Sequence, residues 1–261
     1  CEIGTVTPET RGAFEKKLNE LKNALEKAGN DNYALCALTG MNGMTYEQCV
    51  AAAEIISASQ GEGAILPKVA DSGWENEKDA AEKIMASGRE MSALQAEILE
   101  KFEPSVLGYD SSDALVRWKT ADSKWFISKH FGTKKLVTEL AAHAKSKETV
   151  TKENIVSFYD KLNRIAALKK DINAAPVTVK EGFGKLWNGE NTDWNALEKA
   201  VAKSVAVGKD ISSAPFDNSV KKAICGALDN AKPVSGLDAL SKTVNEMESD
   251  FGIDTEKLIR G

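Results

Sequence analysis

Apolar residues recur at steps of three and four along most of this chain, which is the spacing of one face of an α-helix. The first such segment follows Thr7-Pro8, a good N-cap with proline at the first helical position, and Gly29-Asn30 is expected to end it. Its apolar positions are Phe14, Leu18, Leu21, Leu25 and Ala28. This narrow stripe is typical of a coiled coil, so the helix needs a partner.

A second helix is predicted from a capping box. Thr45 and Gln48 stand three residues apart, as the hydroxyl and amide of such a box do, and the helical pattern then runs to about Ser57. Breakers lie on both sides, at residues 40–43 and 61–67.

The longest periodic segment runs from about Trp74 to Phe102, and Pro104 ends it. At 1.5 Å per residue this helix would extend about 40 Å, a length typical of a protruding hairpin or stalk. Gly88 lies inside it and costs about 1 kcal/mol relative to alanine. We therefore expect another helix to approach closely at Gly88, or the helix to bend there.

The second half of the chain also reads as helices. Residues 111–147 predict two or three short helices with a break near Gly132-Thr133, and Thr151 caps a helix to about Asn173 that is long enough to return antiparallel to the stalk. Further helices are expected at 193–209, from Pro215-Phe216 onward and around 237–247, with a terminal turn at 254–259. No period-two strand pattern and no fixed repeat is found.

A polar turn between two tryptophans, residues 187–194, is the most distinctive stretch. Thr192 is expected to be the N-cap of the following helix, with Asp193 in its first turn and Gly189 in the turn itself. Trp187 and Trp194 would pin the turn to the helical body. We interpret the motif as a structural corner.

The predicted fold class is all-α, with a long antiparallel, coiled-coil-like helical hairpin and a smaller bundle. Residues 1–261 are expected to form a single all-helical domain. This domain could have two lobes, with the acidic N-terminal helices and the stalk at 1–110 and a bundle with the return helix at 111–261.

Charge is segregated along the chain. The 261 residues carry a net charge of −5, yet residues 116–147 hold eight Lys/Arg against two Asp/Glu, while residues 1–103 hold ten against eighteen. The acidic balance argues against a protein that coats nucleic acid, so any such binding must be local.

The basic segment interleaves cations with aromatic rings between Arg117 and Lys135. Exposed rings could stack on bases while the cations neutralise phosphates. The helical spacing of Trp118, Trp125 and Phe126 instead favours rings that point into the core, with the lysines on a solvated face. The candidate nucleic-acid contacts are Arg117, Lys119, Lys124, Lys129, Lys134 and Lys135.

The cysteines (Cys1, Cys36, Cys49, Cys225) are widely spaced and form no C-x-x-C pair, so neither a disulfide framework nor a zinc site is indicated. We expect a reducing, cytoplasmic compartment. Cys1 fits the start of a cut fragment, or else the lipidated cysteine of a processed bacterial lipoprotein. No apolar run is long enough to cross a bilayer, and no signal peptide is recognised.

The chain lacks the residues of familiar catalytic sites. It has no G-x-x-x-x-G-K-[ST] loop, no H-E-x-x-H and no G-x-S-x-G, and it contains just two histidines. Glu139 and His143 are four apart, which predicts a surface contact rather than a metal site. We expect no catalytic, cofactor or metal residues here, and no enzyme activity from this chain alone.

Four segments of the chain carry a family resemblance: residues 18–25, 43–47, 124–132 and, above all, Phe183 to Trp194. Together they resemble the helical insertion of large bacterial superfamily-one DNA/RNA helicases. In such proteins this block interrupts the first RecA-like domain. The resemblance implies a non-catalytic accessory domain whose partners are the parent's motor domains, with ATP and magnesium bound by the parent, with DNA or RNA as a further partner and with no membrane role.

Other interpretations stay open. The basic segment could bind single-stranded nucleic acid, whereas an exposed apolar patch near the hairpin tip would favour docking of a protein. Alternatively, the chain is a stand-alone helical scaffold, or a surface lipoprotein anchored through Cys1.

Overall fold

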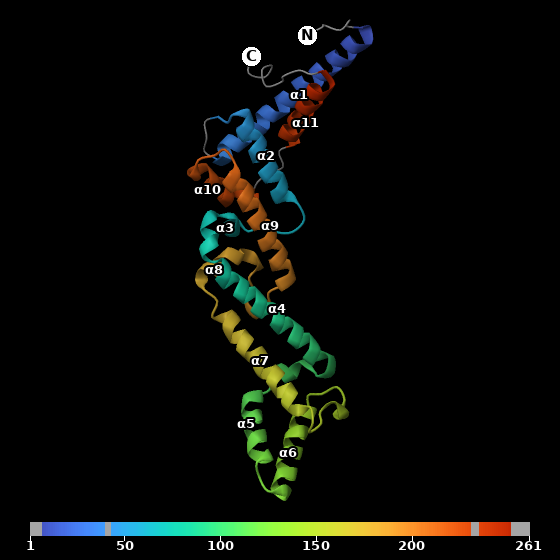
Figure 1. Ribbon diagram of the computed structural model, residues 1–261, viewed down its shortest axis with the longest axis vertical. Coiled ribbons are helices and arrows are strands. Elements are labelled where there is room, and N and C mark those ends of the chain that lie inside the picture. The colour runs from blue at the N-terminus through green and yellow to red at the C-terminus, as the bar shows by residue number, and fades with distance from the viewer. Residues whose placement is uncertain (1–6, 40–42, 231–234, 252–261) are drawn as a thin grey trace. The chain divides into compact units, whose positions relative to one another are not determined.

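The computed structural model describes residues 7–39, 43–230 and 235–251. Within these ranges the chain is built from α-helices joined by short 3-10 turns, with no strand beyond one isolated bridge between Phe102 and Ala144 (Figure 1). The predicted all-α class is confirmed. None of the described helices is long and apolar enough to cross a membrane.

The α-helices are α1 (Pro8–Thr39), α2 (Tyr46–Gln60), α3 (Pro67–Ala70), α4 (Lys78–Lys101), α5 (Ser111–Asp122), α6 (Phe126–Ala141), α7 (Ile155–Asn173), α8 (Val177–Phe183), α9 (Trp194–Ser213), α10 (Asn218–Ala227) and α11 (Ser235–Phe251). The 3-10 helices are η1 (Ser72–Asn76), η2 (Pro104–Gly108), η3 (Lys147–Thr149), η4 (Gly184–Leu186), η5 (Gly189–Asn191) and η6 (Leu228–Asn230). The expected terminal turn at 254–259 and Cys1 lie outside the described residues.

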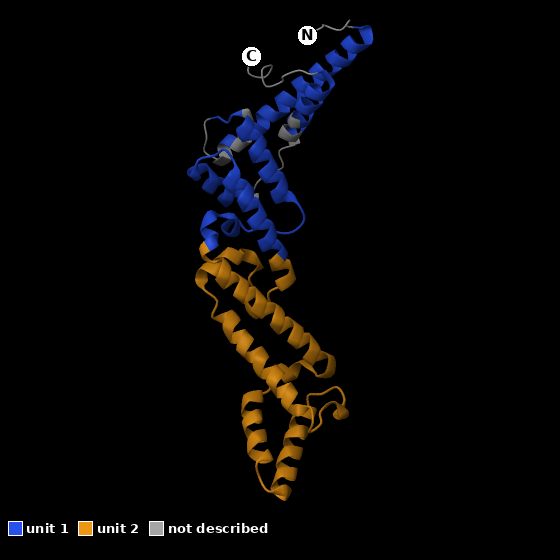
Figure 2. Cartoon of the chain, in the orientation of Figure 1, with its two compact units in different colours: residues 1–75, 199–261 blue, residues 76–198 orange. Residues whose placement is uncertain are grey.

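The chain divides into two compact units, coloured separately in Figure 2. Unit 1 comprises Cys1–Glu75 with Lys199–Gly261, and unit 2 comprises Asn76–Glu198.

In unit 1 the coiled-coil-like α1 finds its partner in α11. The rings of Phe14 and Phe251 meet edge-on with centroids 5.3 Å apart, and the Gly236 N–H donates to the Asp31 carboxylate at 2.7 Å. Phe14 lies early in α1 and Phe251 late in α11, whereas Asp31 lies late in α1 and Gly236 early in α11. The two helices therefore run antiparallel. Thr7 caps α1 as predicted, since its hydroxyl accepts the Thr10 N–H.

The predicted end of α1 at Gly29-Asn30 is wrong, because the helix continues to Thr39. Both residues face solvent, and nothing lies within 4 Å of where a Gly29 side chain would start. Ala28, one position earlier, is buried against the rest of unit 1. Packing of this continuous face outweighs the roughly 1 kcal/mol that a mid-helix glycine costs.

The capping box of α2 is confirmed. The Gln48 N–H donates to the Thr45 hydroxyl at 3.2 Å, and the Thr45 N–H donates to the Gln48 side-chain oxygen at 3.0 Å. The helix runs on to Gln60, three residues beyond the expected end. The loop after it is fixed by α9, because the Lys203 ammonium donates to the carbonyls of Gly61 and Gly63 at 2.5 and 2.9 Å.

In unit 2 the long helix α4 lies beside α7 (Figure 1). Arg164 binds both carboxylate oxygens of Glu90 at 2.6 Å, and Lys161 pairs with Glu97. Glu97 comes after Glu90 in α4, but its partner Lys161 comes before Arg164 in α7. The two helices are therefore antiparallel. The expected pairing of the stalk with the return helix is therefore present, although α4 begins at Lys78 because the preceding residues form η1.

The close approach expected at Gly88 is confirmed. A Cβ at this position would lie 2.1 Å from two ring carbons of Trp194, far inside ordinary contact. The neighbour is the tryptophan ring at the start of α9 rather than the backbone of a second helix.

The expected break near Gly132-Thr133 is wrong, since α6 runs through both residues and the turn lies at 123–125. A Cβ on Gly132 would lie 2.9 Å from the Cβ of Ala121 on α5. The glycine therefore does not end a helix. It lets α5 and α6 approach closely.

Thr151 is not the N-cap of α7, which begins at Ile155 with Asn154 before it. The Asn154 side-chain oxygen instead accepts the Thr151 N–H at 2.8 Å, which makes a separate turn. Similarly, α10 begins two residues after Phe216, where the Asp217 carboxylate accepts backbone N–H groups.

Candidate nucleic-acid interface at the tip of a helical hairpin

Helices α5 and α6 form a second, shorter helical hairpin (Figure 1). The turn between them and the helix ends beside it, residues 119–135, form a surface that we call the hairpin tip. Every residue from Asp122 to Phe131 is exposed. Four large apolar side chains stand among them, with exposed fractions of 78% for Trp125, 76% for Phe126, 54% for Ile127 and 68% for Phe131. Such a run of exposed rings is unusual on a protein surface and marks a contact site.

The prediction that the rings point into the core is confirmed for Trp118, which is 8% exposed, and wrong for Trp125 and Phe126. That prediction assumed one helical phase from 118 to 126. The chain leaves the helix after Asp122, and Trp125 lies in extended backbone as the N-cap residue of α6. The turn resets the phase and carries both rings away from the buried face.

The buried face of α6 begins only at Thr133 and continues with Leu136 and Leu140. The first turns of α6 therefore extend past the packing against α5. The sequence analysis did not identify Ile127 as a candidate site residue. The feature that could have indicated its exposure is its position in the first turn of a helix, directly after Trp125-Phe126.

The candidate cations of the hairpin separate into two groups. Arg117 pairs with Glu139 at 3.1 Å and with Asp113 at 2.7 Å, and the hydrogen bond to Glu139 is the main cause that raises the pKa of the guanidinium. Lys129 pairs with Asp122 at 2.8 Å. Both charges are largely satisfied within the hairpin.

The other candidates are exposed and make no ion pair with any described part of the chain; they are Lys119, Lys124, Lys134 and Lys135. The hairpin tip therefore carries uncompensated positive charge around its aromatic rings. This positive charge attracts anionic ligands to the hairpin tip.

Glu139 and His143, expected to contact each other, have different partners. Glu139 binds Arg117, while the His143 Nδ1 atom lies 2.9 Å from the Ser105 hydroxyl. Within the described residues no group of three or more His, Cys, Asp or Glu side chains could hold a metal ion.

No family model, curated protein or solved structure matches this chain. The geometry of its own residues therefore carries the functional argument.

The two-tryptophan turn is built as a corner of unit 2. Trp187 packs edge-on against Trp194 with centroids 6.0 Å apart, and Gly189 takes a φ of +57°, which favours glycine. The prediction that Thr192 is the N-cap of α9 is wrong. Its hydroxyl accepts the Asn188 N–H at 2.9 Å and donates to the Gly189 carbonyl at 2.8 Å.

Asp193 takes the capping role instead, because its carboxylate accepts the Ala196 N–H at 3.0 Å. With Thr192 as the cap, the helix would begin at Asp193, but it begins one residue later, at Trp194. The Thr192 hydroxyl cannot cap it because this hydroxyl already closes the turn. Thr192 and Asp193 thus bond to backbone groups and the two tryptophan rings pack against each other, so the contacts in this turn are those of a structural corner.

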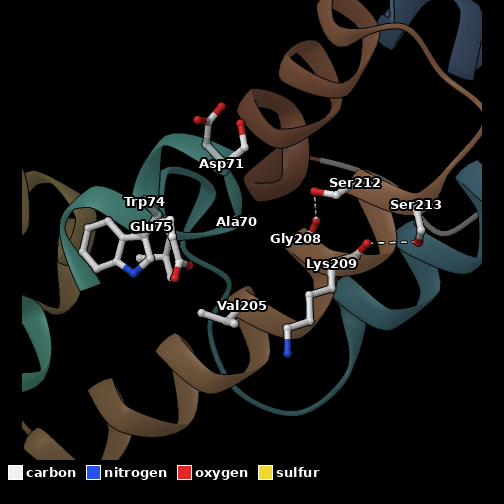
Figure 3. A pocket seen from close by; sticks show the side chains of 11 residues that line it. Ala70, Asp71, Trp74, Glu75, Val205, Gly208, Lys209, Ser212 and Ser213 are labelled. Carbon is white, nitrogen blue, oxygen red and sulfur yellow. Dashed lines mark hydrogen bonds between the residues drawn. The ribbon is translucent and has the colours of Figure 1, made fainter. Parts of the chain in front are cut away.

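Unit 1 contains a pocket of about 440 Å³ between α9 and the segment of α3 and η1 (Figure 3). Its polar groups are largely used locally. The Ser212 and Ser213 hydroxyls donate to carbonyls of their own helix at 2.8 and 3.0 Å, and the Asp71 carboxylate accepts the Gly73 N–H at 2.8 Å. No nucleophile and base are paired there, so the hairpin tip is the stronger candidate site.

Proposed function

We propose that this chain is a non-catalytic helical module that binds single-stranded nucleic acid through its hairpin tip. One observation carries the proposal: three aromatic rings, Trp125, Phe126 and Phe131, are exposed within seven residues at the start of α6, among lysines that have no ion-pair partner in the described chain. Each ring that stacks on a base contributes about 1–3 kcal/mol, and the lysines add a salt-dependent attraction to phosphates.

The proposed setting is an accessory domain of an ATP-dependent helicase. The resemblance supports it, because residues 124–132 lie in the hairpin tip and residues 183–194 form the tryptophan corner. The absence of nucleotide-binding motifs from the sequence is compatible with this setting, since the parent's RecA-like motor domains would bind ATP and magnesium. The module would contact nucleic acid and couple that contact to the motor.

Binding is tested with labelled, unstructured DNA and RNA oligonucleotides in fluorescence anisotropy. Affinity should fall steeply with salt, and the double charge reversal Lys134→Glu/Lys135→Glu should weaken binding on every sequence alike. Replacing both Trp125 and Phe126 by alanine should weaken it at least about thirty-fold, because the loss of two stacked bases costs at least about 2 kcal/mol.

Two controls match these changes. Lys83→Glu/Lys222→Glu alters two exposed lysines outside the hairpin by the same total charge and should leave affinity nearly unchanged. Far-ultraviolet circular dichroism checks that the alanine variants remain folded, as exposed rings predict. A flat salt response, or equal weakening by the control pair, would refute nucleic-acid binding at the tip.

Docking of a protein is the second candidate, and the exposed Ile127 favours it because an aliphatic side chain has no face that stacks on a base. Docking would depend on Trp125, Phe126 and Ile127 and would tolerate both added salt and Lys134→Glu/Lys135→Glu. Binding to vesicles that contain phosphatidylserine, without binding to oligonucleotides, would overturn both proposals.

The helicase setting has its own test in the reading frame that surrounds these residues. A G-x-x-x-x-G-K-[ST] motif outside residues 1–261 would support it. A signal peptide directly before Cys1 would instead support the anchored lipoprotein. The purified chain should not hydrolyse ATP, and titratable ATPase activity that copurifies with it would contradict the non-catalytic assignment.

A further inference from the structure

Two thiols in unit 1 converge on one atom. The Cys36 Sγ and the Cys49 Sγ each lie 3.4 Å from the same side-chain oxygen of Asn32. The two sulfurs are therefore no more than twice 3.4 Å apart, although they belong to different helices. No spacing rule indicates this pair, since 12 residues separate the cysteines in the sequence.

The local structure explains the convergence. Cys36 follows Asn32 by one helical turn on α1, so both side chains lie on the same side of that helix. Cys49 is the fourth residue of α2, directly after the capping box of Thr45 and Gln48 that fixes the start of the helix. The end of α1 and the start of α2 thus present their thiols to each other.

A disulfide joins sulfurs about 2.05 Å apart on Cβ atoms about 3.5–4.5 Å apart. Thiols that share one hydrogen-bond acceptor need a change of side-chain rotamer and a small shift of the helix ends to reach this geometry.

We propose that Cys36 and Cys49 form a reversible disulfide bond between α1 and α2 when the chain meets a disulfide oxidant such as oxidised glutathione. The Cys36 thiolate attacks one sulfur of the oxidant, which forms a mixed disulfide and releases one glutathione thiolate. The Cys49 thiolate then attacks the Cys36 sulfur, forms the Cys36–Cys49 bond and releases the second glutathione. Two protein thiols are oxidised, one glutathione disulfide is reduced to two thiols, and the two protein protons go to them.

The order of the two steps follows from burial. Cys36 is half-buried and can meet an oxidant, whereas Cys49 is 5% exposed and can reach only a neighbour. Burial is also the main cause that raises the pKa of Cys49 to about 11, so this thiol is a poor first nucleophile near neutral pH. Cys225 is buried as well, and its sulfur lies 3.6 Å from the Ala70 carbonyl, which makes it an internal control.

The experiment treats the full chain with glutathione buffers from fully reduced to fully oxidised, blocks remaining thiols and maps the peptides by mass spectrometry. Trypsin leaves both cysteines in one peptide, residues 28–68, which should lose two hydrogens. A protease that cuts after glutamate separates them at Glu47, so the fragments 27–47 and 48–54 should remain joined until a reductant is added.

Three variants make the result decisive. Cys49→Ser should stop the reaction at a glutathione adduct on Cys36, Cys36→Ser should leave Cys49 unmodified, and Cys225→Ser should form the Cys36–Cys49 bond as the parent chain does. The oxidised chain should also unfold at a higher temperature than the reduced chain, because the bond limits the unfolded state.

The proposal fails if the fragments 27–47 and 48–54 separate at every glutathione ratio. It also fails if a glutathione adduct on Cys36 accumulates without closing, or if joined fragments contain Cys1 or Cys225 instead. These outcomes are independent of nucleic-acid binding by the hairpin tip, so each proposal can fail alone.

Discussion

Replacing Gly88 by alanine tests the packing that holds the tryptophan corner on α4. The added Cβ would lie 2.1 Å from the Cδ2 and Cε2 atoms of Trp194 and 2.5 Å from Cε3. Carbon atoms in contact prefer about 3.5–4.0 Å, so the indole ring would have to move by roughly 1.5 Å. Trp194 is 4% exposed and already packs edge-on against Trp187, so free space for that movement is scarce.

The magnitude follows from two opposing effects. Overpacking a filled core costs typically 1–3 kcal/mol, and a contact this short belongs at the upper end of that range. Alanine in a helix interior returns about 1 kcal/mol relative to glycine. We expect Gly88→Ala to lower the free energy of unfolding of unit 2 by about 2 kcal/mol.

Urea unfolding followed by tryptophan fluorescence measures this loss, because four of the five tryptophans lie in unit 2. Gly29→Ala is the matched control: it changes another mid-helix glycine, with nothing within 4 Å, and should stabilise unit 1 by up to about 1 kcal/mol. Trp194→Leu should reduce the cost of Gly88→Ala when the two are combined. A neutral or stabilising Gly88→Ala, or an undiminished cost in the Trp194→Leu background, would refute the reasoning.

Two further predictions concern buried polar and thiol groups. Thr192→Val removes the hydroxyl that serves both Asn188 N–H and Gly189 C=O and should cost about 1–3 kcal/mol in urea unfolding. Thr192→Ser keeps the hydroxyl and should cost clearly less, and equal losses would contradict this account. Burial raises the pKa of Cys49 and Cys225 from 9.0 to about 11 in the folded chain. As the pH rises, the unfolded chain therefore loses these protons at a lower pH than the folded chain does. Their contribution to stability is complete below pH 9 and is lost as the pH rises toward 11. In reductant, the decline between pH 9 and pH 11 should be shallower in Cys49→Ala/Cys225→Ala than in the parent chain, and parallel declines would exclude the thiols as its cause.

The sequence by itself determined the helices and several of their starts. The spacing of apolar residues and the capping side chains are local properties of the sequence. The cap Thr7 before α1 and the Thr45–Gln48 capping box before α2 could therefore be predicted directly. Gly88 was also informative, because an expensive glycine inside a strongly periodic helix indicates that something must come close to it. The pairing of α4 with α7 followed from their similar length and amphipathic stripes.

Tertiary structure decided where local signals compete with packing. Gly29 reads as a helix end, and Gly132 reads as a break, yet both lie inside helices whose packed faces outweigh the local cost. Thr192 reads as an N-cap, but its hydroxyl is used within the preceding turn and Asp193 caps the helix.

The features with the clearest functional meaning were likewise decided in three dimensions. The turn at 123–125 interrupts the helical phase, so Trp125 and Phe126 face solvent although their spacing from Trp118 suggested a common buried face. Cys36 and Cys49 share the oxygen of Asn32 because two helix ends meet there. A one-dimensional pattern records which residues belong to a helix. Which of them become neighbours depends on turns and on how faces pack, and those interactions join residues that are distant in the chain.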